Sequence, residues 1–159
     1  MNCAPAFVPG RELLRQRLRA VPVLVWMVLL ALLLRLAAIP FPSLENLMDA
    51  DHIHAWEQGN VARALLAGHG FGSPFLSTQP SPIMPPFYPL IVAVFFYFLG
   101  VHTASSIFAI HAFDCLINSL ACIPIFLLAR RSFGPRVALW SGWGWAIFPY
   151  GIYFSAAWA

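Results

Sequence analysis

The sequence predicts an all-α polytopic membrane protein with about four transmembrane helices and a surface helix in one outer loop. Of its 159 residues, 60% are hydrophobic and only 9% are charged, whereas soluble domains have roughly 25% charged residues. The apolar residues form long runs between short polar breaks, and the mean hydropathy is +0.76. This pattern is typical of helices that cross a bilayer several times and excludes a water-soluble globule.

The charged residues and cysteines exclude two further classes of protein. The formal net charge of +3 comes from arginines, which cluster near the ends of apolar runs. Such clusters are typical of membrane flanks, and no nucleic-acid partner is expected. The three cysteines, Cys3, Cys115 and Cys122, have neither CxxC spacing nor a histidine at metal-ligand spacing. We interpret them as structural rather than as a disulfide framework or a metal site.

The chain begins with a polar flank, residues 1–20, followed by an apolar run, residues 21–39. Positive charge in the flank predicts a cytoplasmic amino terminus, and the run is about long enough to cross a hydrocarbon core of roughly 30 Å. A cleaved signal peptide competes with this interpretation, but its apolar region would be unusually long and would contain Arg35. We expect Arg35 to snorkel to the outer interface or to meet an acid of the next loop.

Residues 40–86 form the long polar segment of the chain and are predicted to be an acidic extracytoplasmic loop. Residues 51–67 lack proline and precede Gly68, which predicts a helix along the membrane surface with Gly68 at its C′ position. The prolines between positions 74 and 86 predict an extended strap after this helix. In the expected four-span topology four flanking arginines lie on each side of the membrane, so their number does not decide the orientation. We give more weight to the first helix, which places the acidic loop on the extracytoplasmic side.

Three further transmembrane helices are predicted at residues 87–101, 104–129 and 137–158. Arg130, Arg131 and Arg136, with Gly134 and Pro135, are expected to end the third helix and turn the chain. Within that helix, His111, Asp114 and Asn118 recur at positions i, i+3 and i+7. An ionisable group in mid-membrane is a functional candidate, but we favour an interhelical polar contact for Asp114.

The loop acids include two candidates for a catalytic carboxylate, although a merely solvated loop is the alternative for the segment as a whole. On a helix from Asp51, Glu57 lies four residues before Val61, so it projects from a largely apolar flank. Partial loss of water there would make the carboxylate a better proton acceptor. Asp51 comes second, because an acid near a helix start also has a structural explanation. His52 and His54 do not share a helix face, so no metal site is predicted and the cofactor requirement stays unknown.

Several motifs in order resemble the amino-terminal third of bacterial GT-C glycosyltransferases. They are similar to family 39 and the Rgt-like integral membrane enzymes, relatives of protein mannosyltransferases and of the lipid A aminoarabinose transferase. The motifs are WEQGNVAR (56–63), GHGFGSPF (68–75), PPFYP (85–89), FLG (98–100), NS (118–119), ARRSFG (129–134) and FPY (148–150).

The resemblance implies that a sugar is transferred from a polyprenyl-phosphate donor to an extracytoplasmic lipid, glycan or protein acceptor at a bacterial cytoplasmic membrane. In such enzymes a carboxylate of the first outer loop acts at the site, and Glu57 is the best match, with Asp51 second. The resemblance further implies that Arg63 or Arg35 contacts the lipid phosphate. Pro85, Pro86 and Tyr88 are the remaining substrate-binding candidates. Some relatives have a lysine before the Pro-Pro pair, where this chain has Met84.

The resemblance also implies more spans than this chain contains. We therefore expect an amino-terminal fragment of such an enzyme, whose missing spans would complete the donor cavity. The alternative is a non-catalytic small membrane protein, a transporter subunit or assembly partner, that uses His111, Asp114 and Asn118 to bind other helices.

Overall fold

The chain is built of helices throughout the part that the structure describes. The computed structural model describes residues 10–39, 56–72 and 84–157. Every regular element in these ranges is an α-helix, so the predicted all-α class is confirmed. In chain order the helices are α1 (Gly10–Ala38), α4 (Glu57–Leu66), α5 (Phe87–Leu99), α6 (Ala104–Leu120), α7 (Cys122–Phe133), α8 (Pro135–Ala146) and α9 (Pro149–Ala157).

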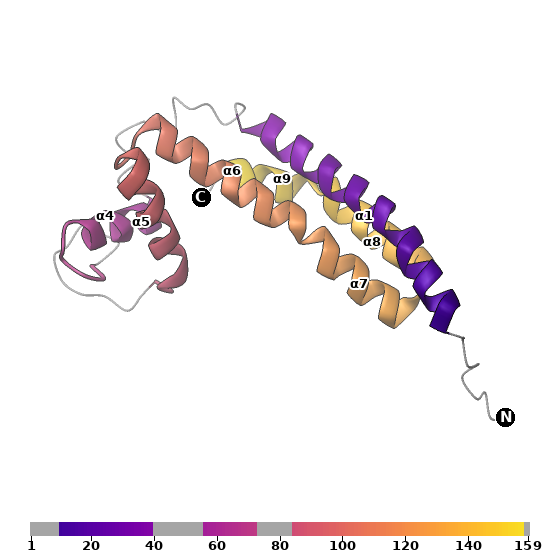
Figure 1. Ribbon diagram of the computed structural model, residues 1–159. Helices are drawn as coiled ribbons and strands as arrows, with labels where there is room; N and C mark the ends of the chain where they lie inside the picture. Colours follow the sequence, from indigo (N-terminus) through magenta and orange to yellow (C-terminus); the bar gives the residue numbers. More distant parts are fainter. Residues whose placement is uncertain (1–9, 40–55, 73–83, 158–159) are drawn as a thin grey trace.

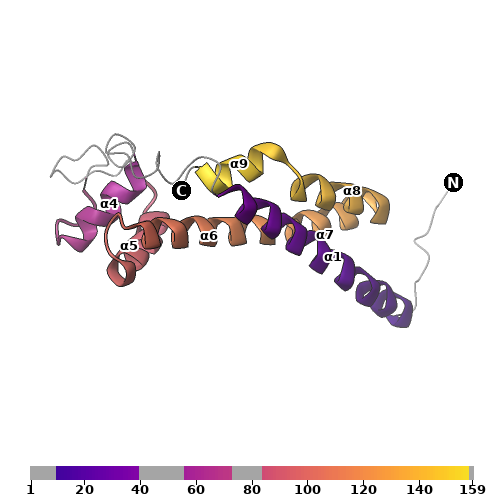
Figure 2. The same cartoon turned by 90° about the horizontal axis from the view of Figure 1, so that it is seen from above.

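Most of these helices pack side by side as an elongated bundle (Figure 1). The helix α1 runs antiparallel to the rod of α6 and α7, because Met27 packs in one cluster with Ala129 while Ile39 packs with Cys115. The helices α8 and α9 return along α1, beginning with Ala138 in the cluster of Met27. The turn between α7 and α8 therefore lies at the same end of the bundle as the start of α1, as Figure 2 also shows.

The rod of α6 and α7 is interrupted for one residue, at Ala121. Pro124 explains the interruption, because it has no N–H to donate to the carbonyl of Leu120. The rod ends at Gly134, whose φ is +93°, and Pro135 begins α8. The expected turn at Gly134 and Pro135 is thus confirmed, and the helix extends one turn past the predicted end at residue 129.

Helix length supports only part of the predicted four-span topology. Among the described residues, one helix, the α6–α7 rod over Ala104–Phe133, is long and apolar enough to cross a membrane by itself. The apolar helices Pro22–Ala38 and Phe87–Leu99 are shorter. The prediction of about four transmembrane helices is therefore not confirmed.

The predicted fourth span, residues 137–158, is not one helix. The helices α8 and α9 are separated at Ile147 and Phe148. Pro149 accounts for the break, because it lacks the N–H that would donate to the carbonyl of Trp145 and disfavours helical geometry at Phe148. The apolar run concealed this break, since hydropathy does not register a single proline.

The helix α1 begins well before the apolar run that predicted it. It starts at Gly10, inside the predicted flank of residues 1–20, and continues through Pro22 to Ala38. Arginine, leucine, glutamate and glutamine are all good helix formers, so a polar flank can extend an apolar helix. The hydropathy pattern located the apolar part of this helix but not its first part, residues 10–20, which makes about three turns.

A smaller unit, made of α4 and α5, lies against the first turns of α6, at the end of the bundle opposite the α7–α8 turn (Figure 1). Its core contains Ala62 from α4, Val92 and Phe96 from α5, and Ile110 from α6. The side-chain oxygen of Thr103 caps α6 by accepting a hydrogen bond from the next turn. This core fixes the position of α4 relative to the bundle.

The end of α4 matches the prediction for this helix. Gly68, whose φ is +79°, donates its N–H to the carbonyl of Leu65 over 3.1 Å, and His69 donates to the carbonyl of Ala64 over 3.0 Å. These two bonds form a Schellman motif, which needs a residue with positive φ at the C′ position. The start of the predicted helix, at residues 51–55, lies outside the described residues.

Candidate functional site

Glu57 begins α4 and lies at the edge of the packed face of this helix. Its side chain is half-buried, and Val61, one turn further on, is 1% exposed. The first turn of a helix has N–H groups without helical partners and a partial positive charge, which together stabilise a carboxylate. A carboxylate at such an edge can accept a proton from a bound hydroxyl group. Asp51, the second predicted catalytic residue, lies outside the described residues.

Beside Glu57, three aromatic side chains form a cluster that the sequence analysis missed. The ring of Trp56 lies 5.8 Å from that of Phe96 and 6.0 Å from that of His102, and the latter two are 5.0 Å apart. Trp56 lies directly over Gly59, where an added Cβ would be 2.3 Å from the ring. The spacing Trp-x-x-Gly was the available signal, because residues three apart share a helix face. The aromatic cluster fixes the backbone from which the Glu57 side chain extends.

Arg63 lies on the same helix as Glu57 but on another face. It is exposed, and six positions along a helix correspond to a rotation of about 240°. The arginine is therefore not directed to the same side of α4 as the carboxylate. Pro85 and Pro86 are exposed before α5, and Pro86 is its N-cap residue. Both prolines shape the entry into α5, since prolines are tolerated where the first N–H groups lack helical partners.

Tyr88, a predicted substrate-binding residue, is held by an acid of the neighbouring helix. Its hydroxyl donates a hydrogen bond of 2.6 Å to Oδ2 of Asp114, and its ring packs against the core that contains Phe96. A short hydrogen bond to a carboxylate is among the stronger kinds, so it joins α5 firmly to α6. Asp114 thus makes the interhelical contact favoured for it, with a partner from the same chain.

Arg35 is fully buried and caps the end of α8. Its guanidinium donates to the carbonyls of Trp145 over 3.2 Å and Ala146 over 3.1 Å, and to that of Ala31 in its own helix over 3.2 Å. The last carbonyls of a helix have no intrahelical donors and carry a partial negative charge. Because Pro149 lacks an N–H, the carbonyl of Trp145 also loses its regular helical donor.

The location of Arg35 differs from the two expected ones, the outer interface and an acid of the next loop. The arginine lies inside the bundle, where a Cβ added to Gly151 would be 3.4 Å from Nη2. Its hydrogen bonds to helix carbonyls assign it a structural role in place of the predicted contact with a lipid phosphate. The physical reason is that Pro149 ends α8 next to Arg35 in space, which the linear sequence does not reveal.

The polar contacts continue from α8 to α6. The indole N–H of Trp145 donates to the backbone carbonyl of Asn118 over 2.9 Å, and the side-chain amide of Asn118 donates to the backbone carbonyl of Asp114 over 3.0 Å. With the bonds of Arg35 and Tyr88, these contacts connect α1, α8, α6 and α5. Buried polar groups need such partners, so the network stabilises one arrangement of the helices.

The described residues contain no group of three or more His, Cys, Asp or Glu side chains that could hold a metal ion. Cys115 and Cys122 are buried free thiols, and the sulfur of Cys115 lies 3.5 Å from the carbonyl oxygen of Ser155. Both thiols are part of the packed interior, as expected for structural cysteines. His52 and His54 lie outside the described residues.

Comparison with known proteins does not assign the chain to a family. No family model, no curated protein and no solved structure matches it.

Proposed function

We propose that the bundle crosses a membrane with its arginine-rich end in the cytoplasm and α4 on the extracytoplasmic side. The crossing segments are α1, the α6–α7 rod, and α8 followed by α9. The helix α5 has 13 residues, which makes it about 20 Å long, shorter than a hydrocarbon core of roughly 30 Å. It enters the membrane part of the way, so the proposal has three crossing segments rather than four.

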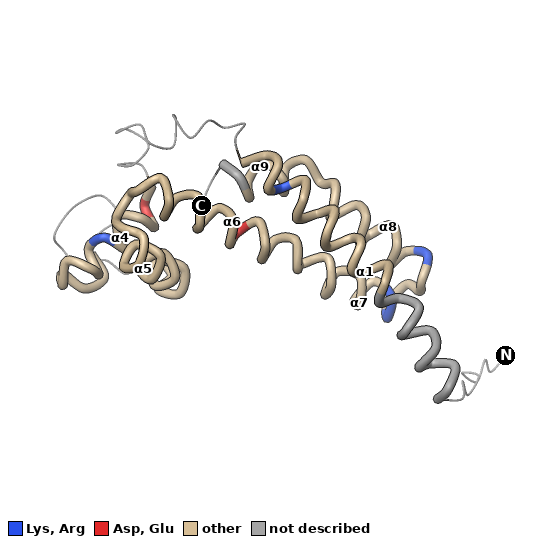
Figure 3. The backbone as a smooth tube through the Cα atoms, turned by 45° about the horizontal axis from the view of Figure 1, so that its top comes forward, with Lys and Arg blue, Asp and Glu red and all other residues tan. Residues whose placement is uncertain are grey.

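The distribution of arginines supports this orientation. The first turns of α1 and the α7–α8 turn share one end of the bundle, and Figure 3 shows basic residues at that turn. This end carries Arg11, Arg15, Arg17, Arg19, Arg130, Arg131 and Arg136, whereas α4 carries Arg63. With this antiparallel packing, the arginines are no longer equally divided between the two sides, as the four-span topology implied. Most of them lie at one end of the bundle, and the positive-inside rule assigns that end to the cytoplasm.

We propose further that the chain is the amino-terminal part of a glycosyltransferase that uses a polyprenyl-phosphate sugar. The observation that carries this proposal is the position of Glu57, half-buried on α4 at the end of the bundle away from the arginine cluster. Asp114, the acid of α6, is bound by Tyr88, so it is engaged in structure. Glu57 is therefore the described carboxylate best placed to meet an acceptor on the outer side.

The proposed chemistry is a transfer to a hydroxyl group. Glu57 takes the proton of the acceptor hydroxyl while the oxygen of that hydroxyl bonds to the anomeric carbon of the sugar. The bond between that carbon and the donor phosphate oxygen breaks, and polyprenyl phosphate leaves.

The replacement of Glu57 by glutamine tests the catalytic part of this proposal. General-base catalysis typically contributes about 100-fold to 10,000-fold in rate, so Glu57→Gln should lower sugar transfer by at least about 100-fold. Transfer is measured with labelled polyprenyl-phosphate sugars and the full-length protein in vesicles. Glu12→Gln, the same chemical change at the opposite end, is the control and should leave transfer unchanged. Full activity of Glu57→Gln would remove this carboxylate from the mechanism.

Cysteine labelling tests the orientation separately. In a Cys3→Ser background, Glu57→Cys should react with a membrane-impermeant maleimide on intact spheroplasts. Arg131→Cys should react only after the membrane is permeabilised. The buried Cys115 and Cys122 should contribute little background. The reverse labelling pattern would refute the orientation whatever the activity assay shows.

The non-catalytic alternative has less support. It requires His111, Asp114 and Asn118 to bind helices of another protein. Within the described residues, Asp114 binds Tyr88 and Asn118 binds within the bundle. Asp114 and Asn118 are thus engaged inside the chain, and His111 is 2% exposed, so the three residues offer little to an external helix.

A further inference from the structure

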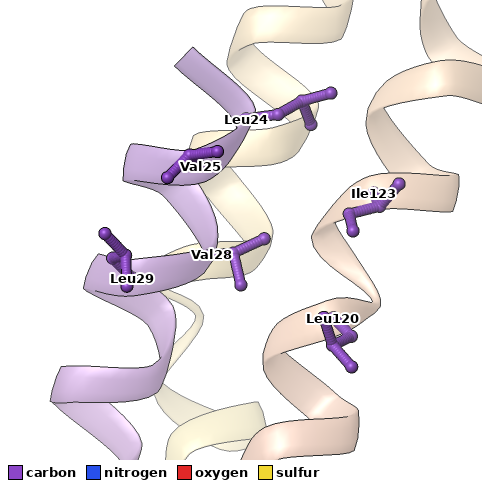
Figure 4. A pocket seen from close by; sticks show the side chains of 6 residues that line it. All are labelled: Leu24, Val25, Val28, Leu29, Leu120 and Ile123. Atoms are coloured by element: carbon purple, nitrogen blue, oxygen red, sulfur yellow. The ribbon is translucent and has the colours of Figure 1, made fainter. Parts of the chain in front are cut away.

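An apolar groove lies between α1 and the α6–α7 rod. It has a volume of about 380 Å³. In Figure 4, the side chains of Leu24 and Val28 point from α1 toward the rod, which carries Ile123. The lining consists of Leu24, Val25, Val28, Leu29, Leu120 and Ile123. Val25 and Leu29 are each 49% exposed, so the groove is open to the surroundings of the bundle.

The groove lies close to the arginine-rich end. Ile123 precedes Arg131 by eight positions on the same helix, which corresponds to about 12 Å along the axis. Arg131 and Arg136 are exposed on either side of the α7–α8 turn. An aliphatic groove thus lies about two helical turns from a cationic surface. This arrangement is complementary to an amphiphile with an anionic headgroup.

We propose that the groove binds one acyl chain of an anionic membrane phospholipid, whose phosphate is bound by Arg131 and Arg136. The proposal rests on the membrane-crossing bundle proposed above but not on glycosyl transfer. In that bundle the α7–α8 turn lies at the level of the cytoplasmic headgroups, where anionic lipids gather near basic residues. The chain then lies along the groove while the phosphate stays at the interface.

The lining favours an acyl chain over a helix of another protein. Helices that pack closely in membranes present small residues such as glycine, alanine and serine to each other. This groove is lined by leucine, valine and isoleucine, which keep a second helix backbone at a distance. It also has no polar side chain among its lining residues to orient a polar ligand. A flexible hydrocarbon chain needs neither feature.

Native mass spectrometry of the full chain in detergent tests the headgroup contact. The probes are dioleoylphosphatidylglycerol, which is anionic, and dioleoylphosphatidylcholine, which is not. We expect the phosphatidylglycerol to be retained at least tenfold better. The double variant Arg131→Gln/Arg136→Gln should lower its affinity by about fivefold for each arginine. The matched variant Arg131→Lys/Arg136→Lys keeps both charges and should retain most of the binding.

A pair of valine substitutions tests the groove. Val25→Phe fills it and should lower the affinity for phosphatidylglycerol, while Val94→Phe makes the same change at an exposed position of α5 and should not. Circular dichroism establishes that each variant is folded. If the glutamine pair unfolds, the comparison of phosphatidylglycerol with phosphatidylcholine on the unmodified chain provides the headgroup result. Equal retention of the two lipids, or equal effects of the two phenylalanines, would overturn the proposal.

Soluble glycerol phosphate distinguishes a lipid site from a simple phosphate site. We expect it to leave the bound lipid in place at concentrations well above that of the lipid, because the acyl chain supplies much of the binding. If it displaces the lipid at equal concentration, the arginines bind free phosphate and the proposal fails. Loss of sugar transfer in Glu57→Gln has no bearing on these results, so the two proposals fail independently.

Discussion

The centre of the bundle and its α4 end use charged residues in opposite ways. Arg35 is fully buried and donates to three backbone carbonyls, and Asp114 accepts from Tyr88. Glu57 instead lies half-buried at the first turn of a short helix. Charges inside this bundle hold helices together, whereas the charge at its edge is a candidate for contact with a ligand. Asp114 and Glu57 are both half-buried, so burial alone does not separate a structural acid from a candidate catalytic one. The hydrogen bond from Tyr88 identifies Asp114 as the structural acid.

The central region also shows how a helix break and a buried charge depend on each other. Pro149 separates α9 from α8 and leaves the carbonyl of Trp145 without its regular helical donor. A guanidinium has several N–H donors and no acceptor, so it can bond several carbonyls at the end of a helix at once. Arg35 supplies these donors from α1. An ionisable group buried among apolar helices is by default a functional candidate, but here the end of a neighbouring helix explains it.

The largest effect is expected from Arg35→Leu, which removes the donors at the end of α8. Hydrogen bonds to a charged group contribute about 1.5–3 kcal/mol each. Trp145 and Ala146 both lose such a bond, although the carbonyl of Trp145 keeps the N–H of Phe148 over 3.3 Å. We expect the free energy of unfolding to fall by about 3 kcal/mol or more. Far-UV circular dichroism of the protein in detergent, followed against temperature or denaturant, measures this change. A change below about 0.5 kcal/mol would contradict the structural role of the arginine.

A double-mutant cycle sharpens this prediction. Pro149→Ala restores an N–H that can donate to the carbonyl of Trp145, so the carbonyl depends less on Arg35. Arg35→Leu should then lower stability less in the Pro149→Ala background than in the unmodified chain. Equal losses in the two backgrounds would show that the proline and the arginine act independently.

Local features of the fold were predictable from the sequence. The turn at Gly134 and the Schellman motif at Gly68 depend on a few neighbouring residues and on the freedom of glycine at positive φ. The all-α class followed from long apolar runs, which helices satisfy because they pair their own backbone groups. The break at Pro149 was missed because apolar residues continue on both sides of it.

The candidate site was less predictable, because its residues meet through packing between distant segments. The sequence singled out Glu57 and Asp114, but Tyr88 as the partner of Asp114 depends on how α5 packs on α6. Likewise, the aromatic cluster brings Trp56 to His102 across the whole of α5. No periodic pattern within one helix encodes such contacts.

Tyr88→Phe tests whether the hydrogen bond to Asp114 stabilises the fold, as the bonds of Arg35 are expected to do. It removes the hydroxyl donor of a 2.6 Å bond to a carboxylate, and hydrogen bonds to charged groups contribute about 1.5–3 kcal/mol. We expect a loss of about 2 kcal/mol in the free energy of unfolding. Tyr97→Phe, at a position of α5 that is 73% exposed, is the matched control and should change stability by less than about 0.5 kcal/mol. Similar losses in both variants would place the effect in α5 generally and not in the contact.

The smallest change in the free energy of unfolding is expected for a substitution of Gly59. Its effect on sugar transfer should be larger than this small loss of stability suggests. An alanine Cβ there would lie 2.3 Å from the ring of Trp56, so the indole must move, and overpacking costs about 1–3 kcal/mol. Better helix propensity offsets about 1 kcal/mol, which leaves a net loss of about 1 kcal/mol for Gly59→Ala. Gly144→Ala in α8 meets nothing within 4 Å and should instead be neutral or stabilising. If Gly59→Ala shifts the near-ultraviolet circular dichroism of tryptophan and lowers sugar transfer while Gly144→Ala does neither, the aromatic cluster positions Glu57. If transfer is unchanged although the indole has moved, Glu57 acts independently of the packing beneath it.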